Sequence, residues 1–290
     1  MTNFKQMLIA GWAQNKFVCV GIDPTWKKLP THLLQEARTY GDIQTLFDFG
    51  SGIVSKTHDI VLAYKPNFAF FEAFGAPGIE ALRKIVKHIK SVSDVPVILD
   101  AKRGDIETTN DGSVAMAFDY IGADAITVQP YLGYLAMKPF LDQEDKGIIV
   151  LCKTSNKGSD EFQNLDISTS MDNAIAPLYK LVAENVYGKW NYNNNCLLVV
   201  GATYPEELKN VRENVGNMPI LIPGIGAQGG DLERTLEAGF DENGDGVIIN
   251  SSRQIIYASS GTDFAEAARA ETLKLHESIN HVRMDLFARS

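Results

Sequence analysis

Two shortages in this sequence of 290 residues exclude whole classes of partner. The longest apolar runs, such as residues 148–152 and 196–201, are far too short for a membrane span, which needs about 20 apolar residues. Lys and Arg number 27 against 36 Asp and Glu, and the resulting net charge is -9. Broad nucleic-acid binding depends on a basic surface. We therefore expect neither a membrane nor a nucleic acid as a partner.

Cysteine is scarce as well. Cys19, Cys152 and Cys196 each lie in or at the end of an apolar stretch, which is typical of buried thiols in a reducing compartment. The first residues show no basic region followed by an apolar core, so we expect no secretory signal. These features predict a cytoplasmic protein. Neither the cysteines nor the five histidines have the spacing of metal ligands, so no metal is predicted.

Eight short apolar runs alternate with helix-like stretches along the chain. The runs are residues 17–22, 60–64, 95–99, 125–128, 148–152, 197–200, 220–222 and 247–249. Apolar residues at helical spacing lie between them in residues 78–92, 111–121, 173–187, 205–215 and 231–238. Alternation of this kind is typical of parallel βαβ units. The sequence therefore predicts an α/β fold, a single (β/α)8 TIM barrel over residues 1–290, with an open doubly wound sheet as the alternative.

Two connections are longer than a minimal barrel needs. Residues 24–59 contain an additional helical segment around residues 31–39, ahead of the helix that leads into strand two. Residues 153–195 begin with a polar loop and end in a cluster of asparagines. We assign no chemistry to either inserted stretch.

The third apolar run ends in three charged residues, which is unusual for a buried strand. Asp100 and Lys102 are two residues apart, so on an extended backbone both side chains leave the same face. Asp105 follows where the strand gives way to a loop. A lysine between two carboxylates keeps its proton, because each negative charge favours the ammonium form. This cluster therefore suits proton donation, although a lone Asp-x-Lys is more often part of a solvated loop.

Other polar residues follow the remaining strands, where a barrel of this type has its active site. Asp23 follows strand one, Lys65 follows strand two, and Ser155 follows strand five. Taken alone, Lys65 is typical of a surface lysine and Asp23 of a turn.

A glycine-rich loop follows strand seven, ahead of a helix that begins near Asp231. Closely spaced glycines let backbone N–H groups approach an anion, and the helix start adds partial positive charge. Arg253 follows strand eight, and barrels of this type hold phosphate at the loops after strands seven and eight. The sequence therefore predicts a phosphate site at Arg253 and the loop glycines Gly224, Gly226, Gly229 and Gly230.

The motif Asp100-x-Lys102-x-x-Asp105-Ile106 resembles the signature of the orotidine 5′-phosphate decarboxylase family. Further matches occur in the expected order: Gly21-Ile-Asp23-Pro, Lys65, Thr109, and Pro223-Gly-x-Gly-Ala-Gln-Gly-Gly230 with Arg253. The resemblance spans strand one to strand eight. The two long connections make the chain similar to the longer, bacterial-type branch of this family.

The resemblance implies a decarboxylation of orotidine 5′-monophosphate to UMP and CO2, the last step of pyrimidine biosynthesis, without a cofactor. Lys102 would stabilise the developing carbanion and then protonate pyrimidine C6. Asp100 would lie beside the departing carboxylate. Lys65 and Asp105 would complete an alternating charge network that fixes Lys102.

The resemblance also implies the binding residues. Asp23 would bind the ribose, Ser155 the pyrimidine edge, and Gln228 with Arg253 the phosphate. Asp105 and Thr109 would reach into the neighbouring subunit's site, so the expected partner is a second copy of the chain in a homodimer with composite active sites.

Two alternatives remain at this stage. A sugar-phosphate decarboxylase of the same superfamily resembles the Asp-x-Lys-x-x-Asp motif, but it uses magnesium and has an acidic residue where Lys65 stands. A catalytically silent nucleotide-binding barrel would keep the fold without the reaction. Lys65 distinguishes the first alternative, and loss of the substrate's ultraviolet absorbance would distinguish the second.

Overall fold

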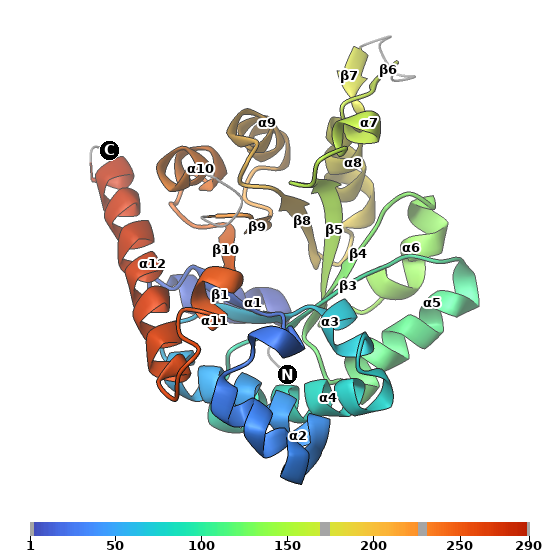
Figure 1. Ribbon diagram of the computed structural model, residues 1–290. Coiled ribbons are helices and arrows are strands. Elements are labelled where there is room, and N and C mark those ends of the chain that lie inside the picture. Colours follow the sequence, from blue (N-terminus) through green and yellow to red (C-terminus); the bar gives the residue numbers. More distant parts are fainter. Residues whose placement is uncertain (1–2, 169–174, 226–230, 289–290) are drawn as a thin grey trace.

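Eight parallel strands form a closed barrel in the computed structural model, which describes residues 3–168, 175–225 and 231–288 (Figure 1). Seven neighbouring pairs form parallel ladders in the order β2-β1-β10-β9-β8-β5-β4-β3. Two isolated parallel bridges, Tyr64 to Val97 and Asn67 to Asp100, join β2 to β3. The predicted (β/α)8 barrel is confirmed. Its strands are β1 (Val18–Ile22), β2 (Ala63–Pro66), β3 (Ile98–Arg103), β4 (Ala125–Val128), β5 (Gly147–Lys153), β8 (Cys196–Val200), β9 (Ile220–Pro223) and β10 (Val247–Ser251).

Strands β2 and β3 extend further along the chain than the apolar runs predicted. The runs at residues 60–64 and 95–99 end before Lys65 and Asp100, whereas the observed strands include both residues. Hydrophobicity marks the part of a strand that is buried among apolar side chains, but backbone pairing continues into the polar rim of the barrel. The charged residues therefore lie on the strands themselves.

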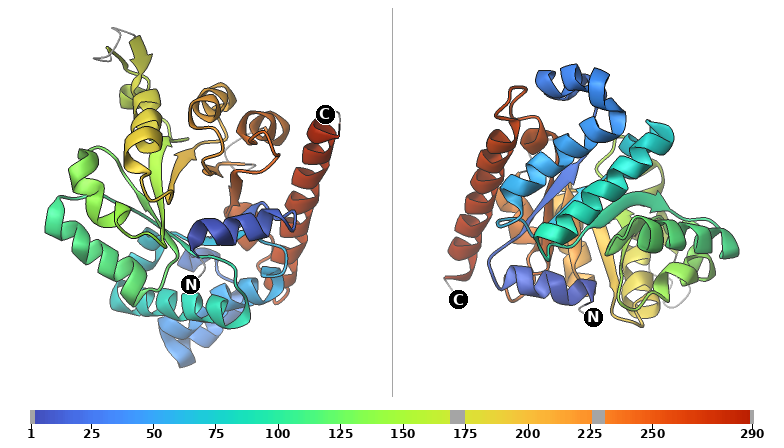
Figure 2. Two further views of the ribbon diagram at one scale, coloured as in Figure 1. Left: turned by 180° about the vertical axis from the view of Figure 1, so that it is seen from behind. Right: turned by 90° about the horizontal axis from the view of Figure 1, so that it is seen from below.

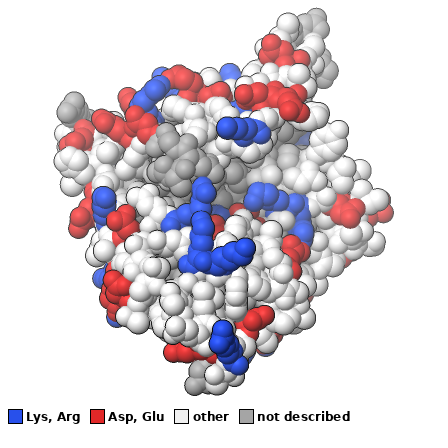
Figure 3. All heavy atoms as spheres, in the orientation of Figure 1, with Lys and Arg blue, Asp and Glu red and all other residues white. Residues whose placement is uncertain are grey.

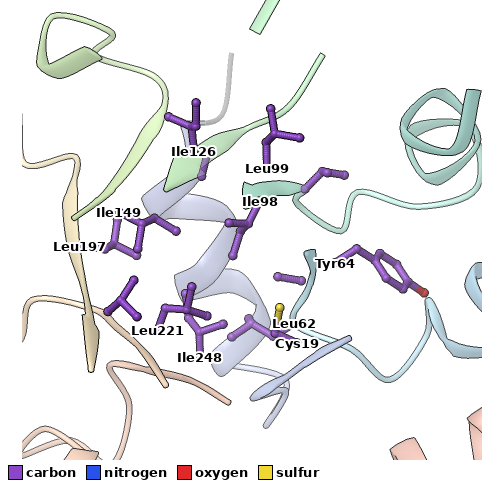
Figure 4. Packing of buried hydrophobic residues seen from close by; sticks show 14 of the residues in the cluster. Cys19, Leu62, Tyr64, Ile98, Leu99, Ile126, Ile149, Leu197, Leu221 and Ile248 are labelled. Carbon is purple, nitrogen blue, oxygen red and sulfur yellow. The ribbon is translucent and has the colours of Figure 1, made fainter. Parts of the chain in front are cut away.

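The barrel interior is filled by apolar side chains from different strands. Figure 4 shows Cys19, Ile98, Ile149 and Ile248 turned toward the centre of the barrel, and all four are buried. Strands of a parallel barrel are covered on both faces, which explains why their sequences are continuous apolar runs. The lower part of the barrel is thus a packed core, and barrels of this type bind their ligands at the end near the carboxyl termini of the strands.

Helix α1 (Phe4–Trp12) covers the opposite, amino-terminal end of the barrel (Figure 2). It begins with a capping box, in which the side chains of Asn3 and Gln6 each accept a hydrogen bond from the other residue's backbone N–H. Trp12 Nε1 donates to the Val247 carbonyl at 2.9 Å, and the Phe4 N–H donates to the Asp145 carbonyl at 3.0 Å. These contacts fix α1 across the amino-terminal end of the barrel.

The remaining helices surround the barrel. The long ones are α2 (Thr31–Thr57), α4 (Gly75–Val92), α5 (Glu107–Val114), α6 (Gly133–Leu141), α8 (Leu178–Asn185), α9 (Pro205–Val215), α10 (Leu232–Gly239) and α12 (Phe264–Phe287). Short ones are α3 (Phe68–Glu72), α7 (Asp160–Gln163), α11 (Arg253–Ile256) and a 3₁₀ turn at Trp26–Lys28. Two π-helical segments, Ala115–Tyr120 and Val186–Trp190, continue α5 and α8.

The inserted stretches differ in part from the sequence prediction. The expected helix near residues 31–39 is present and is separated from the rest of α2 by a kink at Gly41, whose φ is 78°. The helix predicted for residues 173–187 was wrong at its start. Strand β7 (Ile175–Pro177) pairs there with β6 (Asp166–Ser168), and α8 begins only after Pro177, which stands at its N-cap. The helical spacing of apolar residues did not reveal that this segment forms a hairpin.

Two expectations about environment can be compared with the structure. The three thiols are free and buried, as predicted. Within the described residues, no helix combines the length and the apolar character that a membrane span requires.

The packing of α1 leads to a stability prediction. A Cβ atom added at Gly147 would lie 2.2 Å from Phe4 Cδ1, so Gly147→Ala overfills the core between β5 and α1. We expect a loss of about 1–3 kcal/mol in the free energy of unfolding, measured by urea denaturation. Adding Phe4→Leu should recover part of the loss, and an unchanged stability of Gly147→Ala alone would contradict the close contact.

Candidate active site

Three charged side chains form a continuous chain at the carboxyl ends of β2 and β3. Lys65 Nζ donates to Asp100 Oδ2 at 2.7 Å, and Lys102 Nζ donates to Asp100 Oδ1 at 2.6 Å. Lys65 is 4% exposed and Asp100 is 8% exposed, whereas the Lys102 side chain is half exposed. Asp100 thus holds one buried ammonium group and directs a second one toward solvent.

An irregular backbone gives Lys102 this position. The register between β3 and β4 shifts between Leu99 and Arg103, as in a β-bulge, and Lys102 has a φ of 47°. A positive φ is unfavourable for a residue with a side chain and is often retained at functional sites. Thr127 of β4 stabilises the conformation because its hydroxyl accepts from the Lys102 N–H and donates to Asp100 Oδ1, both at 2.9 Å.

Mutual attraction determines the protonation of the buried pair. Burial by itself would raise the pKa of Asp100, but the charges and hydrogen bonds of Lys65 and Lys102 outweigh burial and hold it well below its usual range. Burial by itself would lower the pKa of Lys65, but the charges of Asp100 and Asp23 raise it above its ordinary value. The lysine between two carboxylates of this chain is therefore Lys65.

A cavity of about 170 Å³ lies beside this charge chain and brings together four of the residues that the sequence singled out. Lys65 and Asp23 line it from β2 and the loop after β1, and Gly224 and Arg253 line it from the segments after β9 and β10. Gly224 has a φ of 102°, a conformation that favours glycine. The cavity thus combines two cations, one carboxylate and a glycine turn.

Two oxygen acceptors at this cavity lack a donor among the described residues. Asp23 Oδ1 and Asn250 Oδ1 are both buried and without a hydrogen-bond partner, and both residues line the cavity. Asn250 is 6% exposed. It lies opposite Cys19 in the ladder between β1 and β10, and Cys19 points into the barrel in Figure 4. An unpaired buried acceptor costs about 1–3 kcal/mol, so these oxygens are suited to accept from a ligand.

Lys102 lines a second, larger cavity of about 760 Å³ together with Asp105 and Thr109. Asp105 and Thr109 are both exposed, and Asp105 makes no ion pair with Lys102 within the described part of the chain. The buried Asn110 fixes the loop, because it accepts from the Asp105 N–H and donates to the Asp105 and Ala136 carbonyls. Asp105 and Thr109 therefore line the larger cavity and not the smaller one.

Of the remaining predicted site residues, the structure describes only Ser155, which lines neither cavity. Ser155 packs against Gly201 at the end of β8, where an added Cβ would lie 2.7 Å from Ser155 Cβ. Gln228 and the loop glycines Gly226, Gly229 and Gly230 lie outside the described residues.

The sequence prediction missed Thr127 and Asn250. Both are polar residues inside otherwise apolar strands, and both are nearly inaccessible to solvent. A polar residue in a buried strand, at a position that shares a face with the predicted site, is the signal that could have identified them.

Positive charge gathers around the mouth of the barrel despite the acidic composition. Figure 3 shows Lys and Arg side chains near the centre of this face and acidic side chains mainly toward its edge. The described residues contain no group of three or more His, Cys, Asp or Glu side chains that could hold a metal ion. The site is thus suited to an anionic ligand.

Comparison with known proteins agrees with this geometry. The sequence model of the orotidine 5′-phosphate decarboxylase / HUMPS family matches residues 16–270. The chain belongs to this family. Among the bacterial members, the orotidine 5′-phosphate decarboxylase of Cellvibrio japonicus is 44% identical over 283 residues, which are 97% of this chain and 99% of that protein. This near-complete coverage fits the longer, bacterial-type branch of the family.

Solved structures of this family also resemble the chain. The OMP decarboxylase of Leishmania donovani has a TM-score of 0.81 and 37% identity, with 98% of this chain and 99% of that chain covered. The UMP synthase of Leishmania donovani has a TM-score of 0.85 and 38% identity over 98% of this chain. The present chain spans 57% of that longer protein.

The buried charges predict how stability depends on pH. Because the pKa of Asp100 is lower in the folded protein than in the unfolded chain, its ionised form stabilises the fold at pH values above the unfolded pKa of about 3.9. This stabilisation is lost as the pH falls toward the folded pKa. Asp100→Asn should cost about 3 kcal/mol or more at pH 7, because it leaves Lys65 buried without its closest counterion. Urea unfolding from pH 7 to pH 2 should show this difference shrinking.

Asp119→Asn is the matched control, since Asp119 is exposed. Its unfolding free energy should follow the wild-type curve. A stability difference between wild type and Asp100→Asn that stayed constant down to pH 2 would contradict the pKa assigned to Asp100.

Proposed function

We propose that this protein decarboxylates orotidine 5′-monophosphate to UMP and CO2, the last step of pyrimidine biosynthesis, without a cofactor. The observation that carries the proposal is the chain Lys65, Asp100 and Lys102, whose Lys65 end lines the same cavity as Arg253. The names of the relatives support this substrate, because the Cellvibrio japonicus and Leishmania donovani proteins are both called decarboxylases of this nucleotide.

The proposed reaction needs one proton and no redox step. The bond between pyrimidine C6 and its carboxyl carbon breaks, CO2 leaves, and the electron pair stays on C6. Lys102 stabilises this charge as an ammonium ion and then transfers a proton to C6. Asp100 positions Lys102 through their 2.6 Å hydrogen bond, and its negative charge would lie beside the departing carboxylate of the substrate.

The smaller cavity supplies the remaining recognition. The Arg253 guanidinium and the turn at Gly224 are suited to the phosphate, and Gln228 is expected to add to this contact. Asp23 Oδ1 and Asn250 Oδ1 are acceptors suited to the ribose hydroxyls. On the basis of the family resemblance, we assign Ser155, in the loop after β5, to the pyrimidine edge.

Lys65 argues against the magnesium-dependent alternative. Its ammonium group is the counterion of Asp100 and is favoured by the charge of Asp23, so the negative charge that a divalent cation would need is already compensated. The unpaired acceptors at the cavity do not distinguish an enzyme from a silent nucleotide-binding barrel, because both would use them to bind the ligand. A direct assay is therefore required.

The first test of the function measures turnover of orotidine 5′-monophosphate from the loss of its ultraviolet absorbance. Wild-type protein should be active, and activity should survive excess chelator. Lys102→Ala should lower kcat by at least about a thousandfold, roughly 4 kcal/mol, because it removes an interaction made in the transition state.

Lys138→Ala is a suitable control, since Lys138 is an exposed lysine that pairs with Asp142 away from the mouth. Its turnover should match the wild type. Wild-type protein that binds UMP but does not consume the substrate would favour the silent barrel, and activity that depends on magnesium would favour the sugar-phosphate branch.

We propose further that the protein acts as a homodimer whose sites are shared between subunits. Large apolar side chains are exposed on the segments after β3 and β4, next to the larger cavity: Ile106 at 59%, Met116 at 37%, Tyr131 at 82%, Leu132 at 43% and Leu135 at 75%. Exposed apolar clusters of this kind are typical of interfaces. Asp105 and Thr109 lie among them and would enter the partner's pocket.

Shared sites can be tested by mixing two inactive variants. In a heterodimer of Asp105→Ala and Lys102→Ala, one composite site carries both changes and the other carries neither. Random subunit exchange makes half of the dimers mixed, so about a quarter of all sites should regain activity. If exchange were shown by native mass spectrometry and activity stayed absent, both residues would belong to one pocket within one chain.

A further inference from the structure

Tyr257 connects the loop that carries Asp23 to the segment that carries Arg253, and both of these residues line the smaller cavity. Its hydroxyl donates to the Asp23 carbonyl at 2.9 Å and accepts from the Thr25 N–H at 2.6 Å. The residue between them is Pro24, which has no N–H group of its own. A single hydroxyl therefore satisfies the backbone on both sides of Pro24, in the loop that carries the Asp23 carboxylate.

The ring of Tyr257 is held from the other side. It stacks on the buried Phe49 of α2, with ring centroids 5.9 Å apart and an interplanar angle of 18°. Lys28 Nζ lies 5.5 Å from the ring centroid. These contacts leave the hydroxyl little freedom to move away from the loop after β1.

Tyr257 also belongs to the segment that carries Arg253. Helix α11 begins at Arg253 and ends at Ile256, so Tyr257 is its C-cap residue, and the Tyr257 N–H donates to the Arg253 carbonyl at 3.3 Å. A displacement of Arg253 along the helix is thus transmitted to the tyrosine ring within one helical turn.

We propose that Tyr257 is a positioning residue that couples the phosphate contact of Arg253 to the ribose contact of Asp23. The inference rests on the proposed function, since it assumes a nucleotide in this cavity. A phosphate bound to Arg253 holds α11 in place, and the tyrosine hydroxyl in turn fixes the loop from which Asp23 reaches the sugar. Binding energy at the phosphate is thereby used to organise the reacting centre.

Tyr257→Phe removes only the hydroxyl and keeps the ring contacts. The dissociation constant for UMP, measured by calorimetry, should rise about three- to tenfold, the size expected from one or two net hydrogen bonds. Tyr64→Phe is the matched control, because the Tyr64 hydroxyl bonds to Thr57 and Val54 on the outer side of the barrel. It should lower the melting temperature and leave UMP affinity unchanged.

A double-mutant cycle tests the coupling itself. In the wild-type background, the effects of Asp23→Ala and Arg253→Ala on UMP affinity should deviate from additivity by about threefold or more. In the Tyr257→Phe background the two effects should become additive within about twofold. A merely structural role of Tyr257 would lower stability without changing the coupling.

Each remaining outcome overturns the inference in a recognisable way. Unchanged UMP affinity in Tyr257→Phe, or the same coupling in both backgrounds, would refute the positioning role while the decarboxylase assignment stands. Wild-type protein that binds no UMP and consumes no substrate would refute the proposed function and the positioning role together.

Discussion

The ion pair between Lys65 and Asp100 is the interaction on which the mouth of this barrel depends. Removing two charges from water is costly, and their attraction compensates only when geometry and further hydrogen bonds are favourable. Here Asp100 accepts from Lys65, Lys102 and Thr127, so both carboxylate oxygens are satisfied. The pair is therefore stable only as part of a network, and Lys102 receives its position from that network rather than from its own packing.

Much of the fold follows from patterns that the sequence shows directly. Parallel strands are buried on both faces, so all eight appear as apolar runs, and the residues after them identify the mouth. Asp23, Lys65, Gly224 and Arg253 were identified in this way, and the structure places all four around one cavity. The order of the strands was sufficient for this result because the carboxyl ends of parallel strands meet at one rim.

Other features depend on contacts that no local pattern contains. The bulge at β3 and the positive φ of Lys102 need Thr127, which is 25 residues from Lys102 in sequence. The bridge from Tyr257 to Asp23 joins residues 234 apart. Residues 175–177 were predicted to be helical but form β7, because their pairing with β6 outweighs the helical spacing of the apolar residues. The placement of Asp105 and Thr109 concerns a second chain, and a single sequence can suggest it only by resemblance.

The boundary between β2 and β3, called the seam below, relates the ion pair of Lys65 and Asp100 to local opening of the barrel. Seven strand pairs of the barrel form continuous sets of ladder partners, two of them with a register shift, whereas β2 and β3 are joined by two isolated bridges. The Lys65 to Asp100 ion pair crosses this seam. Local opening events in proteins begin where backbone pairing is sparse. Here such an event would separate Lys65 from Asp100 before the core is exposed. Amide exchange along the seam would therefore report both the local opening of the barrel and the integrity of the proposed active site.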